Sequence, residues 1–219
     1  MKVIYIDSNS KDKIILAVQE AVDFLKAGKI IIYPTDTIYG LGCDALNEKA
    51  VRKIYAIKKR IRSKPVSVMV RDIESINKIA FLSGKNRETA EKIFPGPYTL
   101  IFPGPKNISS IVTGGRNSIG VRIPDNKICQ EMTKLFPNPI ITTSVNLSGE
   151  KNLNDPFEIV DYFRDKKVKP DLILDGGKIK NAQPSIIIDL TRQSPQILRT
   201  GTRNLKEIMK MLEKLKDIK

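Results

Sequence analysis

A chain of 219 residues, 41% of them hydrophobic, is long enough to bury one sizeable core and too short for several domains. The chain contains no histidine, which excludes Ser-His and Cys-His nucleophilic triads and the common histidine-based zinc sites. Its 38 Lys and Arg against 24 Asp and Glu give a formal net charge of +14. This charge attracts the phosphates of nucleotides or nucleic acids, although a solvated lysine coat has the same charge.

Membrane and disulfide signals are also missing from the sequence. No apolar run approaches the ~20 residues that span a bilayer, and the start MKVIYID lacks the pattern of a signal peptide. We therefore expect a cytoplasmic protein with no membrane partner. Cys43 and Cys129 form neither a disulfide framework nor a CxxC metal motif, and we expect both to be buried as small hydrophobic side chains.

The first predicted elements are two helices with a strand between them. Ile14 to Leu25 repeats apolar residues at intervals of three and four, which predicts an amphipathic helix, and Gly28 follows at its left-handed end. Lys29 to Tyr33 (KIIIY) is a β-branched strand that ends at Pro34. A second helix is predicted to begin near Asn47, a favourable N-cap residue.

Strands and helices alternate along the rest of the chain. Short apolar runs predict further strands at Val66 to Val70, Tyr98 to Phe102, Ser118 to Ile123, Ile140 to Thr143, Leu172 to Leu174 and Ile186 to Asp189. Helical patterns occupy Ile73 to Leu82, Arg87 to Phe94, Lys127 to Phe136 and Phe157 to Phe163. Continuous apolar strands need cover on both faces, which predicts an α/β domain. Two helices are adjacent and the last strands have none between them, so we expect a twisted mixed sheet with flanking helices.

The last predicted element is a lysine-rich helix. Its apolar residues share one face: Leu205, Ile208, Leu212 and Leu215. We expect one domain over residues 1–205 and a C-terminal helix over residues 206–219 that packs on the domain or extends from it.

Common nucleotide-binding motifs are weak or missing. Gly40 to Ala45 (GLGCDA) has the GxGxxA spacing of dinucleotide-binding loops, but it does not follow its strand directly and no acidic residue ends a later strand at the expected distance. The sequence contains no GxxxxGK[ST] motif. A nucleotide would therefore bind by another route.

Two polar segments lie at predicted strand ends. Tyr33 to Gly42 (YPTDTIYGLG) is either a tight turn capped by hydroxyls or a ligand site that presents Thr35, Thr37 and free backbone amides at the end of the sheet. The cationic run from Ile57 to Pro65 (IKKRIRSKP) leads directly into the strand VSVMV. This connection would hold its charges at the sheet end.

These segments belong to a series of motifs: YPTDTIYGLG, KxR with a Lys-Pro pair after it, SIGVRIP, PIITTSVNLSG, PSIIIDL and ILRTG. In this order the series resembles the YrdC-like threonylcarbamoyl-AMP synthase family, in its minimal single-domain form, from about Ile14 to Gly201. The resemblance implies the YrdC/RibB-like fold, which is a twisted mixed sheet with a large basic cleft that holds ATP and threonine.

The resemblance also implies roles for individual residues. It assigns L-threonine to Thr37, Arg122, Thr142 and Ser185, and ATP to Arg60, Lys64, Ser118, Ser144, Asn152 and Arg199. Lys58 and Arg60 are the implied catalytic residues on the phosphates, while Mg²⁺ is expected with ATP and no protein side chain is assigned to a metal. A guanidinium at Arg122 can hold a carboxylate bidentately, and hydroxyls at Thr37 and Ser185 can orient the amino acid.

Three positions depart from the longer members of the family. Lys64 replaces Asn, Met69 replaces His, and Thr142-Thr143 replaces Ala-Pro. Met69 cannot form the hydrogen bonds of His, so it is assigned no role. The segment Asn146 to Pro156 is either a simple connection or a lid that brings Asn152 over the nucleotide.

The implied function is L-threonylcarbamoyladenylate synthesis from L-threonine, bicarbonate or CO₂, and ATP, for threonylcarbamoyladenosine modification of tRNA. A downstream threonylcarbamoyl-transferase would consume the product, and a direct contact with tRNA is left open. Two alternatives remain. One is a non-catalytic module that binds double-stranded RNA or tRNA, which the net charge favours, and the other is a carbamoyl-transfer domain of the hydrogenase-maturation type, which shares the fold.

Overall fold

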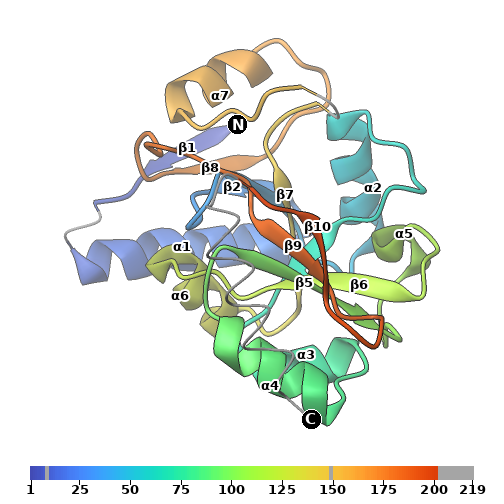
Figure 1. Cartoon of the computed structure of the whole chain (residues 1–219). Coiled ribbons are helices and arrows are strands. Elements are labelled where there is room, and N and C mark those ends of the chain that lie inside the picture. The colour runs from blue at the N-terminus through green and yellow to red at the C-terminus, as the bar shows by residue number, and fades with distance from the viewer. Residues whose placement is uncertain (8–9, 148–149, 202–219) are drawn as a thin grey trace.

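The computed structural model describes residues 1–7, 10–147 and 150–201. Figure 1 shows helices on both sides of a central sheet. The strands are β1 (Lys2–Tyr5), β2 (Ile31–Tyr33), β3 (Gly40–Gly42), β4 (Ser67–Met69), β5 (Tyr98–Pro103), β6 (Ser118–Arg122), β7 (Ile140–Ser144), β8 (Leu172–Asp175), β9 (Ile186–Asp189) and β10 (Gln196–Arg199). The helices are α1 (Lys11–Lys26), α2 (Glu48–Lys58), α3 (Ile73–Ile79), α4 (Gly84–Ile93), α5 (Ser110–Thr113), α6 (Lys127–Leu135) and α7 (Pro156–Phe163).

The strands form one sheet in the order β1-β8-β2-β3-β7-β4-β6-β5-β9-β10. Four neighbouring pairs are parallel, such as β4 with β6, and the others are antiparallel, such as β4 with β7. The prediction of an α/β fold built on a mixed sheet is confirmed.

Local sequence signals explain the first two helices. Ser10 caps α1 by accepting a hydrogen bond from the backbone of Lys13, and Gly28 follows the helix with φ +68°. Asn47 caps α2 in the same way, and Lys59 ends it in a left-handed conformation with φ 46°. This turn at Lys59 directs the rest of the cationic run away from the helix axis.

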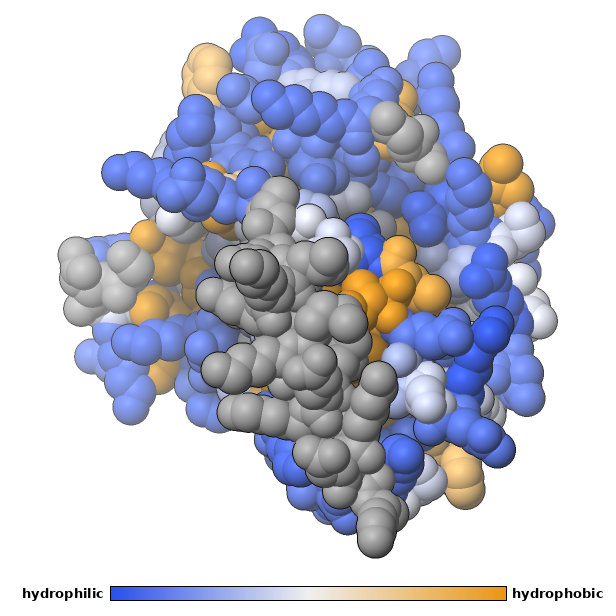
Figure 2. All heavy atoms as spheres, viewed as in Figure 1, coloured by the Kyte–Doolittle hydropathy of each residue, from blue (hydrophilic) through white to orange (hydrophobic). Residues whose placement is uncertain are grey.

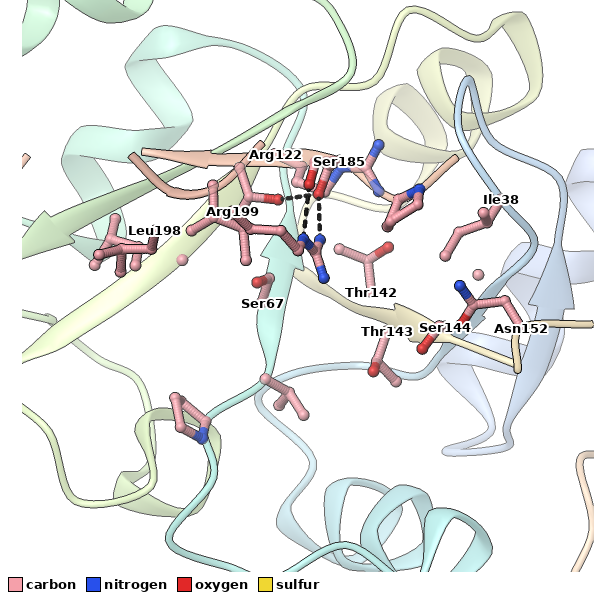
Figure 3. A pocket seen from close by; sticks show the side chains of 18 of the residues that line it. Ile38, Ser67, Arg122, Thr142, Thr143, Ser144, Asn152, Ser185, Leu198 and Arg199 are labelled. Atoms are coloured by element: carbon pink, nitrogen blue, oxygen red, sulfur yellow. Dashed lines mark hydrogen bonds between the residues drawn. The ribbon is translucent and has the colours of Figure 1, made fainter. Parts of the chain in front are cut away.

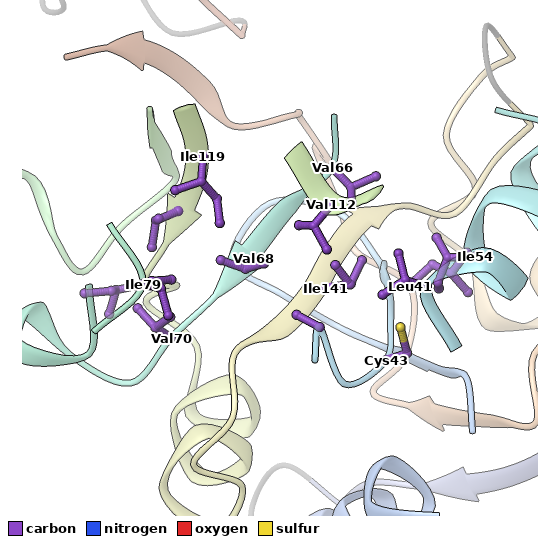
Figure 4. Packing of buried hydrophobic residues seen from close by; sticks show 14 of the residues in the cluster. Leu41, Cys43, Ile54, Val66, Val68, Val70, Ile79, Val112, Ile119 and Ile141 are labelled. Atoms are coloured by element: carbon purple, nitrogen blue, oxygen red, sulfur yellow. The ribbon is translucent and has the colours of Figure 1, made fainter. Parts of the chain in front are cut away.

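Apolar side chains of the central strands form a hydrophobic core on each face of the sheet. Successive residues of a strand point to opposite faces, so Val68 of β4 joins the larger core with Leu41 and Ile141 (Figure 4), while Met69 joins a smaller core beneath α1 and α6. Ile140 of β7 lies in that smaller core as well. The helices α1 and α6 cover this second face only in part, and the remainder is open for a site.

The sequence did not predict β1, β3, β10 or the short α5. The strand β3 lies at the end of YPTDTIYGLG, for which the sequence predicts a turn or a ligand loop, because glycine is unfavourable in strands. Close packing requires glycine there, because a Cβ at Gly42 would lie 2.5 Å from the carbonyl oxygen of Ile141 and 2.8 Å from the ring of Tyr33. The segment is therefore a strand at its end and a polar loop only before Gly40.

We expect Gly42→Ala to lower the free energy of unfolding by at least about 2 kcal/mol, because the new methyl group would push β3 away from β7. Urea denaturation measures this loss. Gly84→Ala is the matched control, because a Cβ at Gly84 meets nothing within 4 Å, and its effect should stay within about 1 kcal/mol. Equal stability of the two variants would contradict the assigned packing of β3.

Other expectations concern the cysteines and the membrane. Cys43 and Cys129 are both free and buried, as expected. Within residues 1–7, 10–147 and 150–201, the helices are too short or too polar to cross a membrane. The predicted helix from Leu205 to Leu215 lies outside the described residues.

Candidate functional site

A pocket of about 330 Å³ occupies the open part of the second sheet face (Figure 3). The alternation that sends Val68 and Val121 into the core sends Ser67, Gly120 and Arg122 into the pocket. The volume lies in the range of about 300–1,000 Å³ that is usual for small-molecule sites. Strands from the centre of the sheet to its β10 edge thus form the floor of a ligand-binding pocket.

Most of the predicted site residues meet at this pocket. Those that line it are Arg60, Ser118, Arg122, Thr142, Ser144, Asn152, Ser185 and Arg199. They come from segments that are far apart in the sequence, and the sheet order brings them together. Lys58, Lys64 and Thr37 do not line this pocket.

Arginines dominate the charge of the lining. Arg60, Arg116, Arg122 and Arg199 line the pocket, and no acidic side chain of the described residues does so. The rest of the lining is polar or apolar, with hydroxyls around β7 and apolar side chains such as Ile187 and Leu198 toward the β10 edge. Figure 2 shows an apolar patch on an otherwise mainly hydrophilic face in the region of β9 and β10, and Leu198 of β10 is 57% exposed. Such a pocket suits a ligand with anionic groups and an apolar part.

Arg199 is fixed against the start of β9 (Figure 3). Its Nε donates to the carbonyl oxygen of Ser185 at 2.9 Å, and its Nη2 donates to the Ser185 hydroxyl at 3.0 Å. That hydroxyl also forms a 2.8 Å hydrogen bond with Thr99. Burial, followed by the positive charge of Arg122, lowers the pKa of Arg199 from its ordinary value. The guanidinium is thus held rigidly beside Arg122, an arrangement that an anion between them would stabilise.

Arg122 forms a buried ion pair with Asp36. Its Nη2 lies 2.8 Å from Asp36 Oδ1 and 3.0 Å from Thr37 Oγ1, and the two charged side chains are only 7% and 8% exposed. The second carboxylate oxygen of Asp36 accepts a hydrogen bond from the backbone of Asp125 at 3.3 Å. The Nε of Arg122 is buried and has no hydrogen-bond partner among the described residues. Since buried donors are normally paired, this N–H points to a ligand acceptor.

This geometry corrects the expected bidentate role of Arg122. Nη2 already donates to two protein oxygens, so a ligand carboxylate cannot use both nitrogens of the Nε–Nη2 edge while Asp36 and Thr37 stay in place. Thr37 thus contacts Arg122, and it lines a smaller neighbouring pocket of about 210 Å³ together with Asp36. Asp36 and Thr37 stand between the two pockets.

Arg60 lines the pocket from the turn just after α2. Its Nη2 donates to the carbonyl oxygen of Pro65 at 2.8 Å and its Nε donates to that of Lys64 at 3.2 Å. Burial lowers the pKa of Arg60 from its ordinary value. The segment just before β4 thus holds a guanidinium against the pocket, whereas Lys64 is exposed and does not line the pocket.

Lys58 is placed differently from the sequence prediction. Its side chain is 1% exposed, and its Nζ donates to carbonyl-type oxygens of Ser144 and Asn146, at distances from 2.5 to 2.9 Å. The resemblance implies that Lys58 acts on the phosphates together with Arg60, whereas the structure buries its side chain, because the last turn of α2 packs into the protein. Nor does Met69 reach the pocket, since it is fully buried beneath α6.

Sequence reasoning missed several residues of this site, among them Asp36, Thr99 and Arg116. Asp36 precedes Thr37 in the PTDT motif, and its proximity to a predicted ligand residue was the available signal. Thr99 is the single threonine in the otherwise apolar and aromatic run YTLIF, and Arg116 follows two glycines in the turn before β6. Neither signal is specific without the sheet order.

The side chains that line the pocket do not fit a metal ion held by the protein. The described residues contain no cluster of three or more His, Cys, Asp or Glu that could hold one, and Mg²⁺ prefers oxygen ligands that include carboxylates. The pocket offers guanidinium groups instead.

The fold and site together define an α/β protein with an arginine-lined pocket of small-molecule size on the open face of a mixed sheet. Residues 23–201 match the model of the Sua5/YciO/YrdC family, which carries the description "Telomere recombination". The chain belongs to this family.

Three relatives illustrate the similarity. A putative threonylcarbamoyl-AMP synthase of Methanocaldococcus jannaschii is 40% identical over 189 residues, which are 84% of this chain and 86% of the relative. The structure of Pyrococcus abyssi Sua5 complexed with L-threonine has a TM-score of 0.84 and 31% identity, and the match covers 96% of this chain but only 61% of that one. Escherichia coli YciO has a TM-score of 0.81 and 29% identity, with coverage of 94% and 97%.

Proposed function

We propose that the protein is an L-threonylcarbamoyladenylate synthase, a nucleotidyltransferase that forms threonylcarbamoyl-AMP and pyrophosphate from L-threonine, bicarbonate or CO₂, and ATP. The observation that carries the proposal is a pocket lined by four arginines, in which the buried Nε–H of Arg122 has no partner among the described residues. Relatives named threonylcarbamoyl-AMP synthase and a relative bound to L-threonine support the same function.

In this reaction the threonine amine first becomes a carbamate, either by adding to CO₂ with loss of a proton or by condensing with bicarbonate with loss of water. A carbamate oxygen then attacks the α-phosphorus of ATP, the bond to the β-phosphate breaks, and pyrophosphate leaves. Such a transfer needs in-line positioning and positive charge around the phosphates more than acid-base catalysis. A site without histidine can therefore perform it.

The pocket supplies these requirements. The guanidinium of Arg60, as the catalytic residue, and those of Arg116 and Arg199 stabilise the phosphates, and Ser118, Ser144 and Asn152 complete the ATP site. Arg122 donates its free Nε–H to the threonine carboxylate, and the hydroxyls of Thr142 and Ser185 orient the amino acid. Magnesium arrives with ATP as part of the substrate and is held by the phosphates.

The product is a mixed anhydride, so the reaction that consumes it is a transfer of the threonylcarbamoyl group to a nucleophile. We assign that step to a downstream transferase that modifies tRNA. No RNA contact is needed for synthesis itself.

Exchange of labelled pyrophosphate into ATP tests the proposal, because reversal of the adenylation step returns the label to ATP. We expect exchange only when threonine and bicarbonate are both present. A module that only binds RNA gives no exchange of pyrophosphate into ATP. A carbamoyl-transfer domain gives no exchange that requires both threonine and bicarbonate. Either result would remove the proposal.

We further expect valine to be a poor substrate, with kcat/KM at least about 100-fold below that of threonine, because the pocket hydroxyls lose their partner when the substrate hydroxyl is missing. Serine keeps the hydroxyl and should react weakly but detectably. Product formation with each amino acid at matched concentrations measures the ratio. Equal turnover of valine and threonine would remove the assignment of Thr142 and Ser185.

A further inference from the structure

The ammonium group of Lys58 is the most deeply buried cation of the described residues, and the proposed chemistry does not use it. It donates to the backbone oxygens of Ser144 and Asn146 at 2.5 and 2.9 Å, and to Asn146 Oδ1 at 2.8 Å. No described carboxylate forms an ion pair with it. Three acceptors match the three N–H groups of one ammonium, so the group is fully engaged inside the protein.

The acceptors lie at the pocket end of β7. The Ser144 hydroxyl, which belongs to a pocket-lining residue, is 2.6 Å from Asn146 Oδ1, and Asn146 Nδ2 donates to the carbonyl oxygen of Glu150 at 2.6 Å. The backbone N–H of Leu153 then donates to the carbonyl oxygen of Val145 at 3.0 Å. These bonds connect Lys58 to residues 144–147 and, through them, to residues 150–153, which include Asn152.

We propose that Lys58 is a positioning residue for the nucleotide site. Its ammonium group fixes the end of β7 together with residues 144–147 and 150–153, and this keeps Ser144 and Asn152 facing the pocket. It acts through those residues and does not contact a phosphate. That the ligand of this site is a nucleotide rests on the proposed function. That Lys58 fixes the end of β7 does not depend on it.

The protonation state of Lys58 connects this role to pH. Burial, followed by the positive charge of Arg60, lowers the pKa of Lys58 to about 7. Below this pH the ammonium serves all three acceptors, and above it the neutral amine has only two N–H groups to donate. Arg60 is the charged group that acts on it, and an arginine guanidinium does not lose its proton in proteins. Nucleotide affinity should therefore fall as the pH rises through about 7.

The test uses Lys58→Met, with Lys49→Met as the matched control, because Lys49 is an exposed lysine of the same helix. Hydrogen exchange of residues 140–147 and 150–156 is measured without ligands, and binding of α,β-methylene ATP is measured at pH 6 and pH 8.5. In Lys58→Met we expect exchange to accelerate by about tenfold or more and the Kd to rise by about tenfold at pH 6. The affinity of this variant should no longer depend on pH, and Lys49→Met should behave as the wild type.

A second variant separates the proposal from a direct phosphate contact and from simple unfolding. Asn146→Ala keeps Lys58 but removes one of its acceptors and the link to Glu150, so it should weaken nucleotide binding and accelerate exchange in the same residues. If Lys58→Met loses nucleotide binding while the hydrogen exchange of these residues is unchanged, the proposal is overturned, and Lys58 contacts a phosphate directly. If the wild type binds no α,β-methylene ATP, the proposed function fails, and the exchange data still decide whether Lys58 fixes β7.

Discussion

Replacing Arg60 by alanine is expected to lower kcat for adenylate formation by about 100-fold, because a preorganised cation next to the transferred phosphate stabilises the transition state by several kcal/mol. Arg60 lines the pocket and is held by the carbonyl oxygens of Lys64 and Pro65, so its position is fixed before the substrate arrives. Pyrophosphate release at saturating threonine, bicarbonate and ATP measures kcat.

Arg62→Ala is the control for this variant. Arg62 belongs to the same cationic run but is exposed and does not line the pocket, so its removal should leave kcat within about threefold of the wild type. Thermal unfolding of both variants separates a loss of catalysis from a loss of stability. If Arg60→Ala retains kcat within that same range, its assignment to the phosphates is wrong.

The second large effect is expected at the buried pair of Arg122 and Asp36. Arg122→Met leaves the Asp36 carboxylate buried without its cation, and the loss of one partner of a buried pair typically costs about 3–5 kcal/mol. Urea denaturation should show a decrease of this size in the free energy of unfolding. Threonine binding, measured by calorimetry, should weaken by at least about tenfold, because the free Nε–H is lost as well.

The double variant Asp36→Asn/Arg122→Met separates these two effects. It removes both charges, so most of the free energy of unfolding should return while threonine binding stays weak. A double variant as unstable as Arg122→Met would show that the pair is not the cause of the loss. A double variant that binds threonine like the wild type would remove Arg122 from the substrate site.

The sequence predicted those parts of the fold that local signals determine. The helix α1 has regular apolar spacing and a Ser10 cap, and the strands β4 to β9 are short apolar runs, so each was found close to its observed bounds. The strand β3 was missed because its glycines are required by contacts with Ile141 and Tyr33, and the chain order does not show those contacts. Local patterns carry no information on such tertiary packing.

The same limit applies to the site. Lys58 and Arg60 are two residues apart and look equivalent in the KxR motif, yet the turn at Lys59 sends Arg60 to the pocket and leaves Lys58 buried behind Ser144. Asp36 was overlooked because its partner Arg122 is distant in the sequence. The cationic residues of the sequence predict a site for anions. Which of these side chains reach the pocket depends on where each backbone segment turns, and the sequence does not show this.

Mass spectrometry of the product tests the central claim most directly. The protein is incubated with L-threonine, ¹³C-labelled bicarbonate and ATP, and the products are separated before any transferase is added. We predict an adenylate with the mass of threonylcarbamoyl-AMP that carries the bicarbonate carbon, together with pyrophosphate. Threonyl-adenylate without that carbon, or recovery of unreacted ATP under conditions in which the protein binds both ATP and threonine, would contradict the account.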